Sequence, residues 1–97
     1  MRVPLDDSEV RSRLASLPDW ELRDAALHRK LKFRSFAEAI SFMTAVAFIA
    51  ERMNHHPDWC NVYDTVTIRL STHDAGGVTE NDLALAAEIS GIQQRFI

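Results

Sequence analysis

The chain has 97 residues, of which 46% are hydrophobic and 26% are charged, and its formal net charge is -3. These values are typical of one folded globular unit, so we treat residues 1–97 as a single domain. Acidic and basic residues are interspersed, which argues against direct binding of nucleic acid, and the single cysteine, Cys60, excludes a disulfide within the chain.

No segment predicts export or insertion into a membrane. The first residues contain a lone basic side chain with no apolar stretch behind it, unlike a signal peptide. The most apolar run, residues 36–50, contains Glu38 and is shorter than the ~20 residues that a membrane span needs. We therefore expect a cytoplasmic protein with no membrane contact.

Apolar side chains in the first third of the chain recur first with a helical period and then with a strand period. The helical spacing is that of Val10, Leu14 and Leu17, with Pro18 as the stop. Two strands are then expected at residues 20–23 and 26–33, joined by a turn at 24–25. Alternation places on one face of the second strand Leu27, Arg29, Leu31 and Phe33.

A long apolar helix is predicted from residue 36 to about residue 53. Ser35 and Glu38 have the spacing of a capping box, in which each side chain accepts from the other residue's backbone amide. Apolar residues occupy nearly every face of this helix, which indicates burial on more than one side. We expect the sheet on one side and a second subunit on the other, and hence a homodimer or homotetramer.

The second half of the chain predicts two further strands and a last helix. The strands are expected at residues 59–62 and 65–72, followed by a turn at 73–77. Thr79, followed three residues later by Asp82, has the pattern of another capping box and marks the start of the last helix. The element order is therefore α-β-β-α-β-β-α, an α+β fold.

Three of the four histidines are candidates for acid–base chemistry. Pro57 disfavours helical geometry at His56, so His55 and His56 are expected in the turn that leaves the central helix. His73 is expected in the turn after the fourth strand. Imidazole can give or take a proton near neutral pH because its unperturbed pKa is about 6.5. The alternative for a His-His-Pro sequence is a polar turn without function.

Two carboxylates could orient these rings. Glu51 lies four residues before His55 and would share a helix face with it. Asp82 could orient His73, or it could only cap the last helix. The spacing lacks the helical histidine pair and the paired cysteines of common zinc sites, so we expect no metal. Cys60 lies in a predicted strand, where packing is expected rather than a nucleophilic role.

The pattern of these residues resembles the pterin-4a-carbinolamine dehydratases, a family also known as dimerisation cofactors of a homeodomain transcription factor. The resemblance covers almost the whole chain, and it rests chiefly on Glu51, His55-His56-Pro57, Tyr63, Thr72-His73, Gly77-Val78-Thr79 and Asp82. Val78 stands where the family usually has leucine, outside the positions needed for chemistry.

The resemblance implies a four-stranded antiparallel sheet with helices packed on it, in dimers or tetramers. The implied reaction removes water from a 4a-hydroxytetrahydropterin, the product of pterin-dependent aromatic amino-acid hydroxylases, and gives quinonoid dihydropterin without a metal or another cofactor. The implied catalytic residues are His55, His56, His73, Glu51 and Asp82. The implied substrate-binding residues are Asn54, Ser71, Thr72 and Asp74, together with the three histidines.

We expect His55 to be the acid, held by Glu51, and His73 or His56 to be the base. Two other functions remain open at this point: a protein-binding module that stabilises dimers of a transcription factor, and a metal-dependent hydrolase. A hydroxylase partner and the side chain of the physiological pterin are not specified by the sequence.

Overall fold

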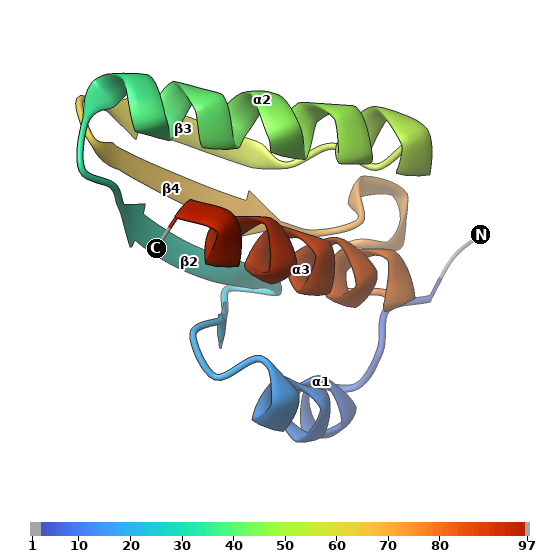
Figure 1. The fold of residues 1–97 in the computed structure, drawn as a ribbon. Helices are drawn as coiled ribbons and strands as arrows, with labels where there is room; N and C mark the ends of the chain where they lie inside the picture. Colours follow the sequence, from blue (N-terminus) through green and yellow to red (C-terminus); the bar gives the residue numbers. More distant parts are fainter. Residues whose placement is uncertain (1–2, 97) are drawn as a thin grey trace.

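The computed structural model describes residues 3–96, and its elements follow the predicted order (Figure 1). The helices and strands are α1 (Asp7–Arg13), β1 (Glu21–Arg23), β2 (Ala26–Lys32), α2 (Phe36–Met53), β3 (Asp58–Val62), β4 (Thr65–Leu70) and α3 (Glu80–Gln93). Short 3-10 turns follow α1, β4 and α3, namely η1 (Leu14–Ser16), η2 (His73–Ala75) and η3 (Gln94–Phe96). The predicted strand ends differ from these bounds by one or two residues.

The four strands form one antiparallel sheet in the order β1-β2-β4-β3. The register pairs Leu27 with Leu70 and Leu31 with Val66, so the predicted apolar face of β2 lies beside buried apolar residues of β4. Helices α2 and α3 run antiparallel to each other and lie on the same side of the sheet (Figure 1). The fold expected from the sequence is therefore confirmed.

The hydrophobic core lies between this sheet face and the two helices. The helices contribute fully buried side chains, among them Phe42, Val46, Leu85 and Ile89. The ring centroids of Phe33 and Phe42 are 4.8 Å apart, and Phe96 of η3 stands edge-on to both. This aromatic group closes the end of the core where α2 begins and α3 ends.

One charged side chain shares the buried face of β2. The Arg29 side chain is only 8% exposed, and its Nη1 donates to Ser90 Oγ of α3 at 3.0 Å. Burial lowers the pKa of the Arg29 guanidinium, and the nearby Asp19 partly offsets that effect. The arginine thus ties the central strand to α3 through polar contacts where the alternation would otherwise place an apolar residue.

The start of α2 differs from the predicted capping box. Ser35 Oγ accepts from the Glu38 amide at 3.0 Å, as expected. The Glu38 carboxylate, however, accepts from the Arg34 amide at 2.9 Å rather than from the Ser35 amide. The salt bridge between Arg34 and Glu38 draws the carboxylate one residue further back along the chain.

Cys60 is exposed, so the expectation that it is packed is wrong. It lies on β3, an edge strand, opposite the exposed Thr67 of β4, and therefore on the sheet face that the helices leave open.

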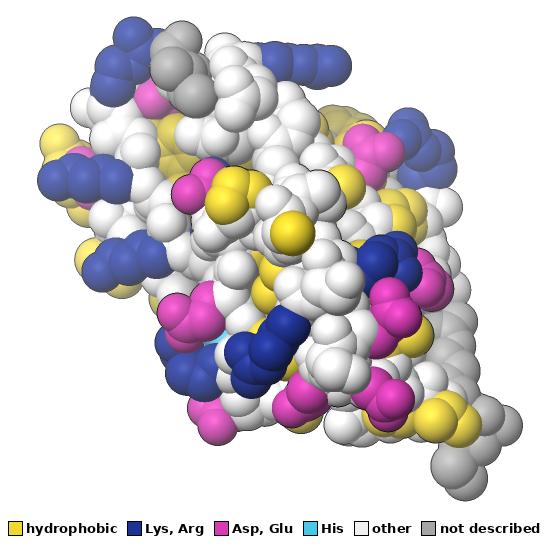
Figure 2. Space-filling view, turned by 90° about the horizontal axis from the view of Figure 1, so that it is seen from below, with side chains coloured by type: hydrophobic (Ala, Val, Ile, Leu, Met, Phe, Trp, Pro, Cys, Tyr) yellow, Lys and Arg dark blue, Asp and Glu magenta, His cyan; other side chains and the backbone are white. Residues whose placement is uncertain are grey.

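Within residues 3–96, no helix combines the length and the apolarity that crossing a bilayer would require. Seen from below, acidic and basic side chains are interspersed over the surface (Figure 2).

The β1–β2 hairpin turn offers a test of backbone strain. Asp24 and Ala25 have φ values of 52° and 60°, in the left-handed region that side chains with a Cβ disfavour. We expect Ala25→Gly to stabilise the protein by about 0.5–1 kcal/mol, because the released strain exceeds the entropy lost by glycine. Urea unfolding measures the change. The control, Ala87→Gly on an exposed position of α3, should destabilise by about 1 kcal/mol, and equal signs for the two variants would contradict the turn geometry.

Candidate active site

The end of α2 determines where the histidine pair lies. Asn54 is left-handed, with φ at 51°, its amide donates to Glu51 O at 3.1 Å, and the His55 amide donates to Ala50 O at 3.0 Å. This pair of hydrogen bonds is a Schellman motif, and asparagine tolerates its left-handed position better than most residues. The motif ends the helical path at Met53, so His55 and His56 leave the helix in new directions, in the turn expected for them.

His55 points into the protein and meets a buried carboxylate. Its Nε2 lies 2.5 Å from Asp82 Oδ1, and the two side chains are 10% and 0% exposed. Asp82 is the third residue of α3, where its Oδ2 accepts from the amide of Thr79 at 2.9 Å. This completes the capping box predicted for Thr79 and Asp82. Asp82 therefore both caps α3 and holds His55.

His56 points outward and contacts the other carboxylate. Its Nε2 lies 2.7 Å from Glu51 Oε1, and these side chains are 56% and 78% exposed. Both predicted pairings, Glu51 with His55 and Asp82 with His73, are therefore wrong. Glu51 would face His55 only if the helix continued through His55. The left-handed Asn54 ends the helix instead, so His55 meets Asp82 and His56 meets Glu51.

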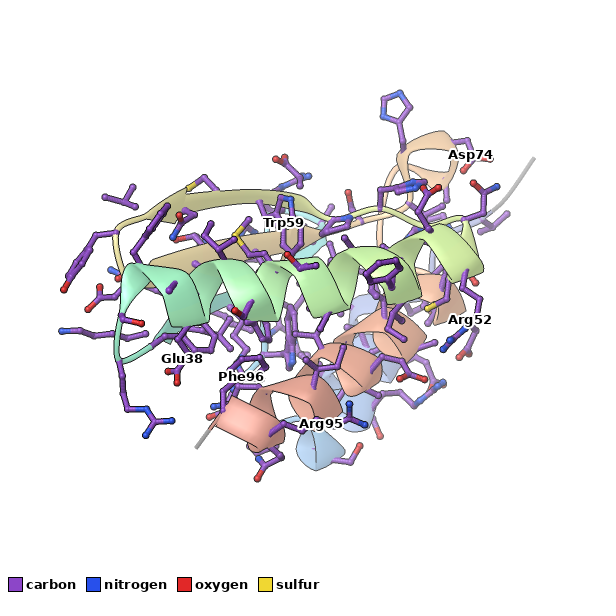
Figure 3. All side chains as sticks on the ribbon, turned by 45° about the horizontal axis from the view of Figure 1, so that its top comes forward. Glu38, Arg52, Trp59, Asp74, Arg95 and Phe96 are labelled. Carbon is purple, nitrogen blue, oxygen red and sulfur yellow. The ribbon has the colours of Figure 1, made fainter. Side chains whose placement is uncertain are left out.

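His73 lies in the η2 turn, and its side chain is exposed. The turn is closed at its base, where the Thr72 amide donates to Gly77 O at 2.8 Å. A side chain at residue 77 would place its Cβ 2.9 Å from Pro4, so glycine allows the N-terminal segment to pass close to this turn. Asp74 in η2 and Arg52 near the end of α2 lie at the same end of the molecule (Figure 3).

The structure distributes the predicted substrate-binding residues between surface and interior. Asn54 and Asp74 are exposed, and Ser71 is half-buried, with its Oγ 3.3 Å from an Arg69 guanidinium nitrogen that donates to it. Thr72 is buried, and its hydroxyl donates to Asp82 Oδ2 at 2.8 Å. Its hydroxyl is thus engaged within the protein, and its amide and carbonyl are hydrogen-bonded within the turn at residues 72–77.

The hydroxyl contacts to Asp82 were not predicted from the sequence. Thr72 Oγ1 lies 2.6 Å from Thr79 Oγ1, which in turn accepts from the Asn81 amide at 3.3 Å. The only signal was the capping pattern of Thr79, since nothing in the spacing places Thr72 beside it. In the described part of the chain, no three histidine, cysteine or acidic side chains gather closely enough to hold a metal ion.

The sequence of the chain is similar to that of a known protein family. The sequence profile of the family described as Pterin 4 alpha carbinolamine dehydratase matches residues 3–92. Proteins from Afipia carboxidovorans and Solibacter usitatus, which carry the name pterin-4-alpha-carbinolamine dehydratase by inference, are 50% and 47% identical to the chain. The two alignments each cover 95% of this chain, with 94% of the Afipia protein and 97% of the Solibacter protein.

Two solved structures are similar to this fold. A transcriptional coactivator/pterin dehydratase from Brucella melitensis is 38% identical, with a TM-score of 0.89 over 92% of this chain and 97% of that chain. A pterin dehydratase-like protein identified as a RuBisCO assembly factor in the alpha-carboxysome is 23% identical, with a TM-score of 0.63 over 75% and 84% of the two chains. The second likeness is one of fold alone.

The two carboxylate–imidazole pairs should differ sharply in their contribution to stability. Asp82→Ala leaves buried donors without an acceptor, so we expect the free energy of unfolding to fall by about 3–5 kcal/mol. Glu51→Ala removes a solvent-exposed pair and should change it by less than about 1 kcal/mol. Urea unfolding of both variants tests the contrast, and similar losses would contradict the assignment of Asp82 as the structural anchor.

Proposed function

Because the chain belongs to the pterin-4a-carbinolamine dehydratase family, we propose that it removes water from 4a-hydroxytetrahydropterin and so recycles the pterin cofactor of aromatic amino-acid hydroxylases in the cytoplasm. The observation that carries the proposal is the buried contact between His55 and Asp82, with the adjacent His56 exposed and bonded to Glu51. The exposed His73 follows Thr72, whose hydroxyl donates to the same Asp82. Three imidazoles match a reaction that needs both an acid and a base, because an imidazole side chain can serve in either role.

The proposed step is an elimination. An imidazolium donates a proton to the hydroxyl on C4a while the C4a–O bond breaks. The electron pair of that bond stays on the oxygen, which leaves as water. The lone pair of N5 forms the double bond to C4a, and a base takes the proton from N5. The products are water and quinonoid dihydropterin, and proton exchange with solvent restores the acid and the base. The step balances without an oxidant, a reductant or a metal.

We assign the role of acid to His55, whose ring contacts Asp82 rather than Glu51. A carboxylate against one ring nitrogen orients the ring and stabilises its protonated form, as in other histidine-dependent enzymes. The base is His73 or His56, both of which are exposed and free to meet a substrate. Glu51, which contacts His56, would support that ring in the same way.

The pterin would bind across the turns that follow α2 and β4. We propose contacts from Asn54, Ser71 and Asp74, because these residues flank the histidines in the sequence and two of them are exposed. The proposed site acts on the pterin ring, which all candidate substrates share, so several pterin side chains would be accepted.

A second subunit is the proposed cover for α2. Phe36, Ile40 and Phe48 recur at multiples of four residues along one face of the helix, and they are 52%, 39% and 73% exposed. Burying this row of large apolar side chains against another copy would remove them from water. We propose a homodimer or homotetramer assembled through this face.

The alternative function is a protein-binding module that stabilises dimers of a transcription factor. The same apolar face of α2 favours it, and the relative from Brucella melitensis is described as a transcriptional coactivator as well as a pterin dehydratase. Such binding would depend on Phe48 and its neighbours and not on His55. A hydroxylase is a further possible partner, since it would supply the substrate.

Loss of the proposed acid should remove most of the activity. We expect His55→Gln to lower the dehydration rate of freshly generated 4a-hydroxytetrahydropterin by ~10²–10⁴-fold, as followed by ultraviolet absorbance. His28→Gln is the matched control, because the His28 ring contacts Arg23 O in the β1–β2 hairpin. An unchanged rate in folded His55→Gln would exclude His55 as the acid. A rate that chelator abolishes in the unsubstituted protein would overturn the metal-free mechanism.

A charge placed on the apolar face of α2 should break the assembly. Phe48→Glu would bury a carboxylate in the proposed interface, so we expect sedimentation to show a monomer of 11.0 kDa in place of the assembly. Ala87→Glu introduces the same charge on the exposed side of α3 and should leave the assembly intact. An unsubstituted protein that sediments as a monomer at high concentration would exclude this interface.

A further inference from the structure

The hydrogen bonds behind His55 form a continuous buried chain. They run from the Asn81 amide to Thr79 Oγ1 at 3.3 Å, on to Thr72 Oγ1 at 2.6 Å, and then to Asp82 Oδ2 at 2.8 Å. Thr72, Thr79 and Asp82 are 3%, 9% and 0% exposed, so water does not compete freely for these groups. No buried polar side-chain atom within residues 3–96 lacks a hydrogen-bond partner.

The direction of each hydrogen bond in this chain follows from its ends. A backbone amide can only donate, and an ionised carboxylate can only accept. The Thr72 hydrogen must therefore point to Asp82 Oδ2, because otherwise two oxygen lone pairs would face each other across 2.8 Å. The Thr79 hydrogen then points to Thr72 Oγ1, and the Asn81 amide donates to Thr79 Oγ1.

This polarity determines what Asp82 presents to the histidine. Oδ2 already receives the Thr72 hydroxyl and the Thr79 amide, so an acceptor atom is required there. Oδ1 is the oxygen left for His55, and as an acceptor it requires a hydrogen on Nε2. A neutral imidazole with its hydrogen on Nε2 has an unprotonated Nδ1.

We propose that Asp82, oriented by the hydroxyl of Thr72, is a positioning residue that holds His55 in the Nε2-protonated tautomer and leaves Nδ1 as the nitrogen that exchanges protons with the substrate. The exchange of protons with the substrate rests on the proposed dehydratase function, whereas the tautomer does not. In this arrangement Nδ1 of the protonated ring delivers the hydrogen to the leaving hydroxyl, and Nε2 keeps its hydrogen throughout.

Asp82→Asn gives a sharp test of the tautomer. The donors of Thr72 and Thr79 select the amide oxygen of Asn for the Oδ2 position, which turns its NH2 group toward His55. A donor facing Nε2 forces the ring into the opposite tautomer, with its hydrogen on Nδ1. Long-range proton–nitrogen correlation spectra of ¹⁵N-labelled protein at alkaline pH distinguish the two tautomers of each histidine. We expect Nε2–H for His55 in the unsubstituted protein and Nδ1–H in Asp82→Asn.

Thr72→Val tests the hydroxyl with little change in shape. We expect the dehydration rate to fall by roughly 10–100-fold, the effect typical when partners that orient a metal-bound histidine are removed. Thr72→Ser restores the hydroxyl and should recover most of the rate, while Thr67→Val on the exposed face of β4 should leave it unchanged. A Thr72→Val rate equal to that of the unsubstituted protein would overturn the role of the hydroxyl.

The spectra separate failure of this inference from failure of the proposed function. Nδ1–H on His55 in the unsubstituted protein would overturn the inference whatever the activity, and this measurement needs no variant to fold. Retention of Nε2–H in folded Asp82→Asn would overturn it as well. The predicted tautomers in a protein without dehydratase activity would uphold the positioning of His55 and reject the reaction.

Discussion

A carboxylate that is fully removed from water must find its donors within the protein, and Asp82 finds them on three segments. The histidine that follows α2, the threonine that follows β4 and the amide that begins α3 all donate to it. Losing any of these partners would leave part of a buried charge unpaired, at a cost well above that of a surface contact. The ends of α2 and β4 and the start of α3 are therefore tied to one another by the group that also orients His55.

The site combines a rigid interior with an accessible surface. His55 is held by buried groups with defined directions, whereas His56, Glu51 and His73 are exposed and contribute little to the fold. Such a division suits acid–base catalysis, because one ring is kept in a fixed orientation while others remain free to meet the substrate. The second capping box supplies the anchoring carboxylate as part of the helix start, so the same residue serves the fold and the site.

The fold was predictable because strand alternation and capping patterns are local properties. Leu27, Leu31 and Val66 all lie on the buried face that their spacing indicates. The partners of the histidines were not predictable, because one left-handed residue, Asn54, redirects the chain and sequence spacing does not report its conformation. Cys60 was placed wrongly because it lies with Thr67 on the sheet face that the helices leave open, and which face the helices cover depends on contacts distant in sequence. The family resemblance identified the histidines as a set without specifying which carboxylate holds which ring.

We propose that His55, His56 and His73 form one pterin site, and pterin binding is the measurement that tests this proposal without depending on turnover. The ring signals of all four histidines can be followed by NMR while a stable pterin without the 4a-hydroxyl is added. We expect the signals of these three histidines to shift with a common saturation curve. The signal of His28, which contacts Arg23 in the β1–β2 hairpin, should stay in place. Unmoved signals for the three histidines at saturating pterin, or a shift confined to His28, would contradict this proposal.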